Sequence, residues 1–112
     1  MRIAIMLVVA AVSLPAGAAD NSVARGRQLF QDVGCYQCHG YVGQGGSAGL
    51  RLAPDPLPYE ALDQFVRETK GQMPAYSREA LSDSDLRAIY AFLQSVPKGR
   101  KVDEIPMLRG LR

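Results

Sequence analysis

The chain of 112 residues has no tryptophan, a single histidine and only two cysteines, and its net charge is +2 at pH 7. So few histidines and cysteines do not supply the four ligands of a usual structural zinc site. There is no strong basic patch of the kind that nucleic-acid binding usually shows, and no run of β-branched residues that predicts a strand. These absences leave a small helical protein whose chemistry must come from few side chains.

The beginning of the chain predicts export. Arg2 precedes an apolar run at residues 3–14, about 12 residues long, which is too short to span the roughly 30 Å of a bilayer core as a helix. The small residues that follow are typical of a signal-peptidase site, with cleavage after Ala18 or Ala19. We interpret residues 1–19 as a cleaved signal peptide, the alternative being an uncleaved anchor. Cleavage leaves about 93 residues, enough for one small domain without a stable membrane span.

The most informative segment is C-Y-Q-C-H at residues 35–39, the pattern by which c-type haem is attached. Two thiols three positions apart can reach the two vinyl groups on one edge of a porphyrin, and the adjacent histidine is placed to bind the iron. A disulfide, a redox dithiol or half of a zinc site are the alternatives for Cys35 and Cys38. A disulfide across so short a loop would stabilise little, and a thioredoxin-like dithiol requires a preceding strand. The pattern predicts one covalent haem c on Cys35 and Cys38, with His39 as an axial ligand.

The second axial ligand cannot be another histidine of the same chain. Methionine is the usual partner in c-type haem proteins that transfer electrons. Met1 and Met6 leave with the signal peptide, so Met73 and Met107 remain. Pro74 favours an extended backbone at Met73, whereas Met107 lies in the terminal tail, where ordering is least assured. We predict Met73 as the second axial ligand and Met107 as a packing residue.

Periodicity predicts three helices, at about residues 23–32, 58–69 and 82–96. Asn21 and Ser22 are the two N-cap candidates for the first of them. The first contains Gly26, which we interpret as the point where another helix approaches closely. The third begins with Ser82 as a hydroxyl cap and ends at a proline. Everything else is predicted to be loop, and the fold class is all-α.

Residues 34–57 have neither a helix nor a strand period, and structureless loops of more than roughly 12 to 15 residues are uncommon in compact domains. A haem would organise this loop, because its edge and faces supply apolar surface that a chain this short lacks. The five glycines of the loop are compatible with tight turns around such a group, or with plain flexibility.

The C-terminal residues 97–112 form a basic tail with five Lys and Arg against two Asp and Glu, whereas residues 20–96 hold seven against nine. The tail is either a segment that docks to an acidic partner or a membrane surface, or a solvated extension that can fold back on the body. We favour the extension because the tail contains apolar side chains to bury: Ile105, Met107, Leu108 and Leu111.

Three motifs together resemble a known family. G-R-Q-L-F at residues 26–30 precedes the haem motif, M-P-A-Y at 73–76 follows it, and L-S-D-S-D-L at 81–86 leads into I-Y-A-F-L at 89–93. With these motifs the chain resembles a class I, single-haem bacterial cytochrome c over residues 20–96.

The resemblance implies a small cytochrome c fold of three main helices, in which the first and last helices cross near Gly26, Phe30 and Tyr90. It also implies thioether bonds from both cysteines, axial ligation by His39 and Met73, and one exposed haem edge.

The loop after the haem motif departs from the family pattern. Many relatives have Gly-Pro there, and the proline carbonyl accepts a hydrogen bond from Nδ1 of the axial histidine. Here Gly49 is followed by Leu50. Because the acceptor is a backbone carbonyl, Leu50 is the first candidate and Pro54 the second.

Iron bound by both His39 and Met73 has no open coordination site. The predicted function is therefore a periplasmic one-electron carrier between redox partner proteins, and not an enzyme. One alternative is a haem c subunit of a larger dehydrogenase or oxidase complex. The other is a five-coordinate, ligand-binding haem protein in which Met73 does not bind.

Overall fold

The computed structural model describes residues 17–110. Almost all of the expected signal peptide lies outside this range, as does Leu111, so cleavage stays a prediction. The described elements are four α-helices and two short 3₁₀-helices: α1 (Gly17–Asp32), α2 (Cys35–His39), α3 (Tyr59–Glu68), α4 (Asp83–Ser95), η1 (Val102–Glu104) and η2 (Pro106–Leu108). Residues 17–110 contain no strand, in agreement with the predicted all-α class. No helix in this part of the chain has both the length and the apolar character needed to cross a membrane.

Helix α1 begins at Gly17, six residues before the predicted start at Val23. The sequence suggested Asn21 or Ser22 as the cap. In the structure both lie inside the helix, and the Ser22 hydroxyl donates to the carbonyl of Ala19 at 2.8 Å. A serine whose hydroxyl bonds backwards in this way no longer caps the following turn, which is why the predicted start was wrong.

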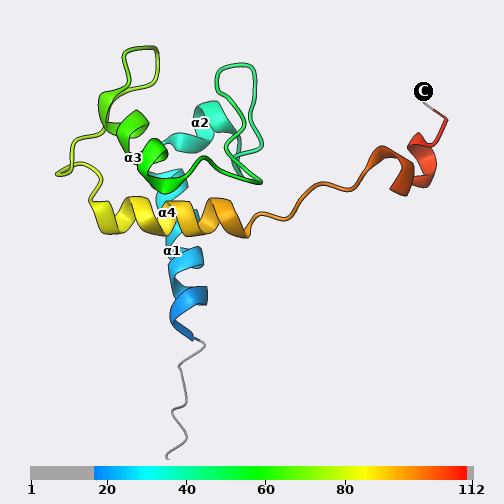
Figure 1. Ribbon diagram of the computed structural model, residues 1–112, viewed down its shortest axis with the longest axis horizontal. Helices are drawn as coiled ribbons and strands as arrows, with labels where there is room; N and C mark the ends of the chain where they lie inside the picture. Colours follow the sequence, from blue (N-terminus) through cyan, green and yellow to red (C-terminus); the bar gives the residue numbers. More distant parts are fainter. Residues whose placement is uncertain (1–16, 111–112) are drawn as a thin grey trace, which may run out of the picture.

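Helices α1 and α4 cross, as Figure 1 shows, and Gly26 lies at the crossing. A β-carbon at Gly26 would overlap the backbone carbonyl of Ala88, so only glycine lets the two backbones approach this closely. The rings of Phe30 and Phe92 pack beside the crossing with centroids 5.6 Å apart. Tyr90, two residues after Ala88 on α4, packs edge-on against Tyr59 at the start of α3.

The segment predicted to be entirely loop contains the short helix α2, Cys35–His39. Gly34 precedes it with a φ of 87° and Gly40 follows with a φ of 77°, so two glycines in the left-handed region separate this single turn from its neighbours. Five residues are too few to show a helical period, which is why periodicity did not reveal α2.

The other two helix predictions agree with the structure to within one or two residues. Helix α3 follows Pro58, and α4 begins after Ser82, whose hydroxyl accepts a hydrogen bond from the backbone N–H of Asp85 at 3.1 Å. The buried core joins α1, α3 and α4 and consists mainly of apolar side chains: Phe30, Leu62, Val66, Leu81, Leu86, Ile89, Phe92 and Leu93.

The C-terminal tail extends away from the helices, as Figure 1 shows. It was predicted to be loop but contains η1 and η2, and these contact each other and none of the four α-helices. Met107 is 89% exposed. One exposed ion pair, between Lys98 and Asp55 at 2.9 Å, joins the beginning of the tail to the body. The described part of the tail is thus a solvated extension that is not folded back.

Candidate haem-binding site

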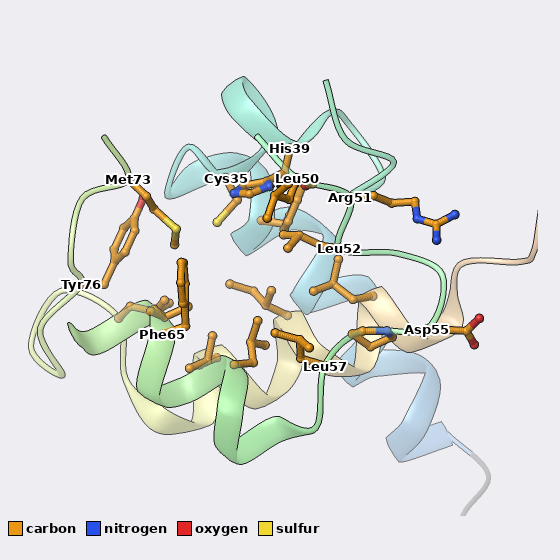
Figure 2. Close-up of a pocket in the computed structure, with 18 residues that line it drawn as sticks. Cys35, His39, Leu50, Arg51, Leu52, Asp55, Leu57, Phe65, Met73 and Tyr76 are labelled. Carbon is orange, nitrogen blue, oxygen red and sulfur yellow. Dashed lines mark hydrogen bonds between the residues drawn. The ribbon is translucent and has the colours of Figure 1, made fainter. Parts of the chain in front are cut away.

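A cavity of about 290 Å³ lies between the core helices and the loops that follow α2 and α3 (Figure 2). Arg51 and Asp55 line one end of it, and their charged groups point outward. The rest of the lining is predominantly apolar and includes Phe30, Leu50, Leu52, Leu57, Leu62, Phe65, Val66, Leu81, Leu86, Ile89 and Leu93. Leu50, Leu57 and Phe65 are exposed although they are large and apolar. An apolar group in the cavity would cover such side chains and so be held by burial.

His39 lies in this lining, at the end of α2. Its Nδ1 is 2.7 Å from the carbonyl oxygen of Leu50. A carbonyl only accepts hydrogen bonds, so Nδ1 carries the proton and donates, which leaves the lone pair of Nε2 for a metal. The acceptor is therefore the carbonyl of Leu50, the first of the two predicted candidates, and not that of Pro54.

Gly49 makes this contact sterically possible. A β-carbon at Gly49 would lie 2.7 Å from the carbonyl oxygen of Cys38 and 2.9 Å from Nδ1 of His39. Distances below 3 Å are closer than carbon and polar atoms tolerate, so any larger residue would displace the loop from α2. The glycine thus serves close backbone approach and not only flexibility.

The two cysteines are placed differently. Cys35 lines the cavity and is partly buried, whereas Cys38 is exposed and does not contribute to the lining. Burial raises the pKa of the Cys35 thiol to about 11. Both cysteines are free, so they do not form the disulfide considered as an alternative. Within residues 17–110 no group of three or more His, Cys, Asp or Glu side chains is placed to form a zinc site.

Met73 lines the cavity from the loop between α3 and α4. Its side chain extends into the cavity across from His39, and Cys35 lies between the two in the view of Figure 2. The side chain is half-buried and packs against the core. Met107 is in the tail, outside the lining, so the structure brings only Met73 together with His39.

Sequence reasoning missed the residues that support Met73. Tyr76 donates its hydroxyl hydrogen to the carbonyl of Val33 at 2.8 Å. Arg67 has a side chain only 8% exposed and binds the chain that follows Met73. The sole signal for Arg67 was its position four residues after Asp63, where an ion pair within a helix is expected.

These residues fit a c-type haem. The donor set consists of an imidazole with Nε2 available, a thioether on the facing side and a cysteine in the wall between them. The apolar lining matches the faces of a porphyrin, which would cover the exposed lining residues Leu50, Leu57 and Phe65. The fold and site define the class: a single-haem c-type cytochrome domain.

Comparison with known proteins places the chain within that class. The model of the family "Cytochrome C oxidase, cbb3-type, subunit III" matches residues 21–93. This match covers more than half of the chain, so the chain belongs to that family. It is a cytochrome c electron-transfer domain, an electron carrier rather than a catalyst, and its two cysteines imply covalent haem c.

Similar proteins include cytochrome subunits of several complexes. The Cbb3-type cytochrome c oxidase subunit CcoP of Helicobacter pylori is 31% identical over 80 residues, which are 64% of this chain and 27% of that protein. The menaquinol:cytochrome c reductase cytochrome c subunit of Bacillus subtilis (strain 168) is 40% identical over 52 residues, 46% of this chain and 20% of that protein. The cytochrome bc1 complex cytochrome c subunit of Corynebacterium diphtheriae is 33% identical over 76 residues, 65% of this chain and 27% of that protein.

The chain therefore spans about a quarter of the length of these relatives. No solved structure matches it significantly.

Proposed function

We propose that this chain is a haem c subunit of a bacterial respiratory oxidase or reductase complex, in which His39 and Met73 are the two axial ligands. The observation that carries the ligand assignment is their position on facing sides of one apolar cavity, with Nδ1 of His39 bonded to Leu50. The free periplasmic shuttle predicted from the sequence is the second candidate. The subunit is preferred because the relatives named above are subunits of such complexes.

The protein's own residues would attach the haem, orient its histidine ligand and influence its reduction potential. Cys35 and Cys38 are the attachment points, and the carbonyl of Leu50 fixes the tautomer and orientation of His39 and makes the ring a stronger ligand. The apolar lining excludes water. A haem bound here would supply reversible one-electron chemistry at its iron, with a potential raised by methionine ligation. If His39 and Met73 both bound the iron of such a haem, no coordination site would be left open, and the site would favour electron transfer over the ligand-binding alternative.

The site assignment is tested by producing the chain together with haem-attachment machinery. We expect a mass gain of one haem and a visible spectrum with the long-wavelength ferric band of methionine ligation. Cys35→Ala combined with Cys38→Ala should abolish the mass gain. An unmodified mass in the wild type would contradict haem attachment, and rapid carbon monoxide binding without the methionine band would favour the five-coordinate alternative.

The choice between subunit and shuttle is tested on native material. Gently solubilised membranes and the periplasmic fraction of the producing bacterium are separated by native electrophoresis and stained for haem. We expect the chain to migrate with a larger oxidase or reductase complex. Recovery only as a small periplasmic protein would favour the shuttle.

Export and the role of the tail belong to the same proposal. N-terminal sequencing of the native protein should show cleavage after Ala18 or Ala19.

A chain that ends at Val96 lacks the basic tail, whose described part contacts none of the α-helices. It should keep its haem and its spectrum, and loss of migration with the complex would assign the tail to docking.

A further inference from the structure

The loop that carries Met73 begins after α3 and has no regular secondary structure. Its far end returns to the helix from which it started, because the backbone N–H of Tyr76 donates to the carbonyl of Val66 at 3.0 Å. Val66 lies in the last turn of α3, where carbonyls lack partners within the helix. The loop is therefore closed at its base, three residues from Met73.

Arg67 strengthens this closure with one guanidinium group. Its Nη1 donates to three backbone carbonyls beyond Met73: Tyr76 at 3.0 Å, Ser77 at 3.1 Å and Leu81 at 2.7 Å. Hydrogen bonds from a charged donor are stronger than neutral ones. One side chain thus holds the whole segment 76–81 against α3.

Two carboxylates hold the guanidinium itself. Asp63, one turn earlier on α3, accepts from Nε at 3.1 Å, and Asp83, in the first turn of α4, accepts from Nη2 at 3.1 Å. A charge that is 92% buried needs such partners, and these satisfy it. Arg67 therefore ties α3, the Met73 segment and the start of α4 into one unit.

We infer that Arg67 is a positioning residue that keeps Met73 directed into the cavity and so maintains methionine as an iron ligand. This inference rests on the proposed function, because it assumes that Met73 binds the iron. Arg67 does not line the cavity; it acts through the backbone that anchors the loop. Without Arg67 the carbonyls of segment 76–81 lose their charged donor, and the loop opens more often.

Arg78 provides a matched comparison. It also pairs with Asp63 and Asp83, at 3.5 and 3.1 Å, but its side chain is 60% exposed. Its hydrogen bonds in the structure are to these carboxylates alone. The two arginines share their acidic partners and differ in the backbone carbonyls, so a comparison of variants isolates the contribution of the carbonyl contacts.

The experiment compares holoproteins of the wild type, Arg67→Gln, Arg67→Lys, Arg78→Gln and Phe92→Leu. Phe92→Leu is a stability control, since Phe92 is in the core beside Phe30 and outside the cavity lining. Each protein is measured under conditions where far-UV circular dichroism shows it to be folded. The readouts are the ferric methionine band, the reduction potential and the rate of carbon monoxide binding to the reduced protein.

For Arg67→Gln we expect retained covalent haem, a weakened methionine band, a lower potential and carbon monoxide binding at least about tenfold faster, because several charge-assisted hydrogen bonds are lost. Arg67→Lys should be intermediate, since one ammonium cannot reach three carbonyls and two carboxylates together. Arg78→Gln and Phe92→Leu should keep the wild-type band, potential and rate.

The inference is overturned if Arg67→Gln lowers only the unfolding midpoint and leaves ligation unchanged, or if Arg78→Gln or Phe92→Leu weakens the band equally. If Arg67→Gln does not fold, Arg67→Lys decides: a wild-type band and rate in that variant also overturn it. A wild type that lacks the methionine band refutes the ligand assignment itself, whereas a wild type with the band and an unaffected Arg67 variant refutes only this inference.

Discussion

The two walls of the cavity, one carrying His39 and the other Met73, are held by different kinds of contact. Around His39 the contacts are local: Nδ1 bonds to the carbonyl of Leu50, and the carbonyl of His39 accepts from the backbone N–H of Gly45 at 2.8 Å. Around Met73 the contacts join separate elements: Arg67 of α3 pairs with Asp83 of α4, and Tyr76 bonds to the carbonyl of Val33, which follows α1.

The difference concerns how each ligand is maintained. The His39 wall lies within residues 35–50 and depends on backbone geometry that glycine permits. The Met73 wall depends on the packing of helices α1, α3 and α4, so a loss of tertiary structure would release it. Residues 69–80, which carry Met73, are all exposed or only partly buried, and segments with few buried apolar contacts open at a lower free energy than the core does. We expect the methionine side to be the first to yield.

The largest effects should come from removing the ligands themselves. His39→Ala should nearly abolish holoprotein, because the attachment motif loses its histidine and Leu50 loses its donor. Met73→Ala should keep the covalent haem but lose the methionine band, and its potential should fall within the roughly 0.8 V range that axial ligands span. Haem staining, mass spectrometry and redox titration measure these outcomes. The control is Met107→Ala, and loss of the band in that variant would reverse the ligand assignment.

The same glycine-to-alanine change should act differently on the two walls. Gly49→Ala should destabilise the protein by about 2 kcal/mol, because its β-carbon would collide with Cys38 and His39. Gly71→Ala, in the Met73 loop, has nothing within 4 Å of the new carbon and should change stability by at most about 1 kcal/mol, with stabilisation favoured. Urea unfolding of the two holoproteins measures both, and equal losses would argue against the close approach at Gly49.

Tyr76→Phe removes one long-range contact of the Met73 wall. We expect a loss of about 1 kcal/mol, because the carbonyl of Val33 loses its hydrogen-bond donor. Burial raises the pKa of Tyr76, so the phenol stays protonated and donates throughout the neutral range. Tyr41→Phe, at an exposed position, is the control and should lie within about 0.5 kcal/mol of the wild type. Chemical unfolding distinguishes the two variants.

The smallest effect should come from the contact between helices α1 and α4, the crossed pair that we call the frame of the cavity. The hydrogen bond from Arg25 lowers the pKa of Asp85, with help from Ser82, and joins α1 to α4. A carboxyl whose pKa is lower in the folded state stabilises the fold above its unfolded pKa, and this stability is lost as the pH falls through the folded pKa. Arg25→Gln should therefore make acid unfolding begin at a higher pH.

The acid effect should stay below about 1 kcal/mol, because the Arg25 side chain is 63% exposed. Circular dichroism and the methionine band, followed together during acid titration, should shift by the same amount, since both walls depend on this frame. Arg27→Gln is the control. A shift of the methionine band alone would show that the ion pair acts on the Met73 wall and not on the frame.

Local sequence signals predicted much of the fold. The Ser82 cap and the apolar stripe of α4 gave a helix that agrees with the structure, and Gly26 is the point of closest helix approach, as predicted. Helix α2 was missed because one turn has no period, and the start of α1 was wrong because Ser22 bonds within the helix. For the site, Cys35 and His39 followed from a short motif, and Leu50 followed from the resemblance to class I cytochromes c.

The residues behind Met73 could not be predicted in the same way. Arg67 looked like one half of an ion pair on a helix surface, and nothing near it in the sequence shows that the carbonyl of Leu81 comes within reach. Contacts between a side chain and a distant backbone leave no periodic signal. The hydrogen bond from the Tyr76 hydroxyl to the carbonyl of Val33 could not be predicted for the same reason.

The sequence by itself determined the cofactor, because two cysteines and one histidine in five residues imply covalent haem c. It also left a single candidate outside the tail, Met73, as the proposed second ligand. Only the tertiary structure decided how that ligand is held. Arg67 of α3 meets Asp83 of α4, and Tyr76 meets the carbonyl of Val33 beyond α1, only when these helices pack together. The physical reason is range: a motif acts through neighbouring residues, whereas the buried guanidinium acts through space between segments that only the fold brings together.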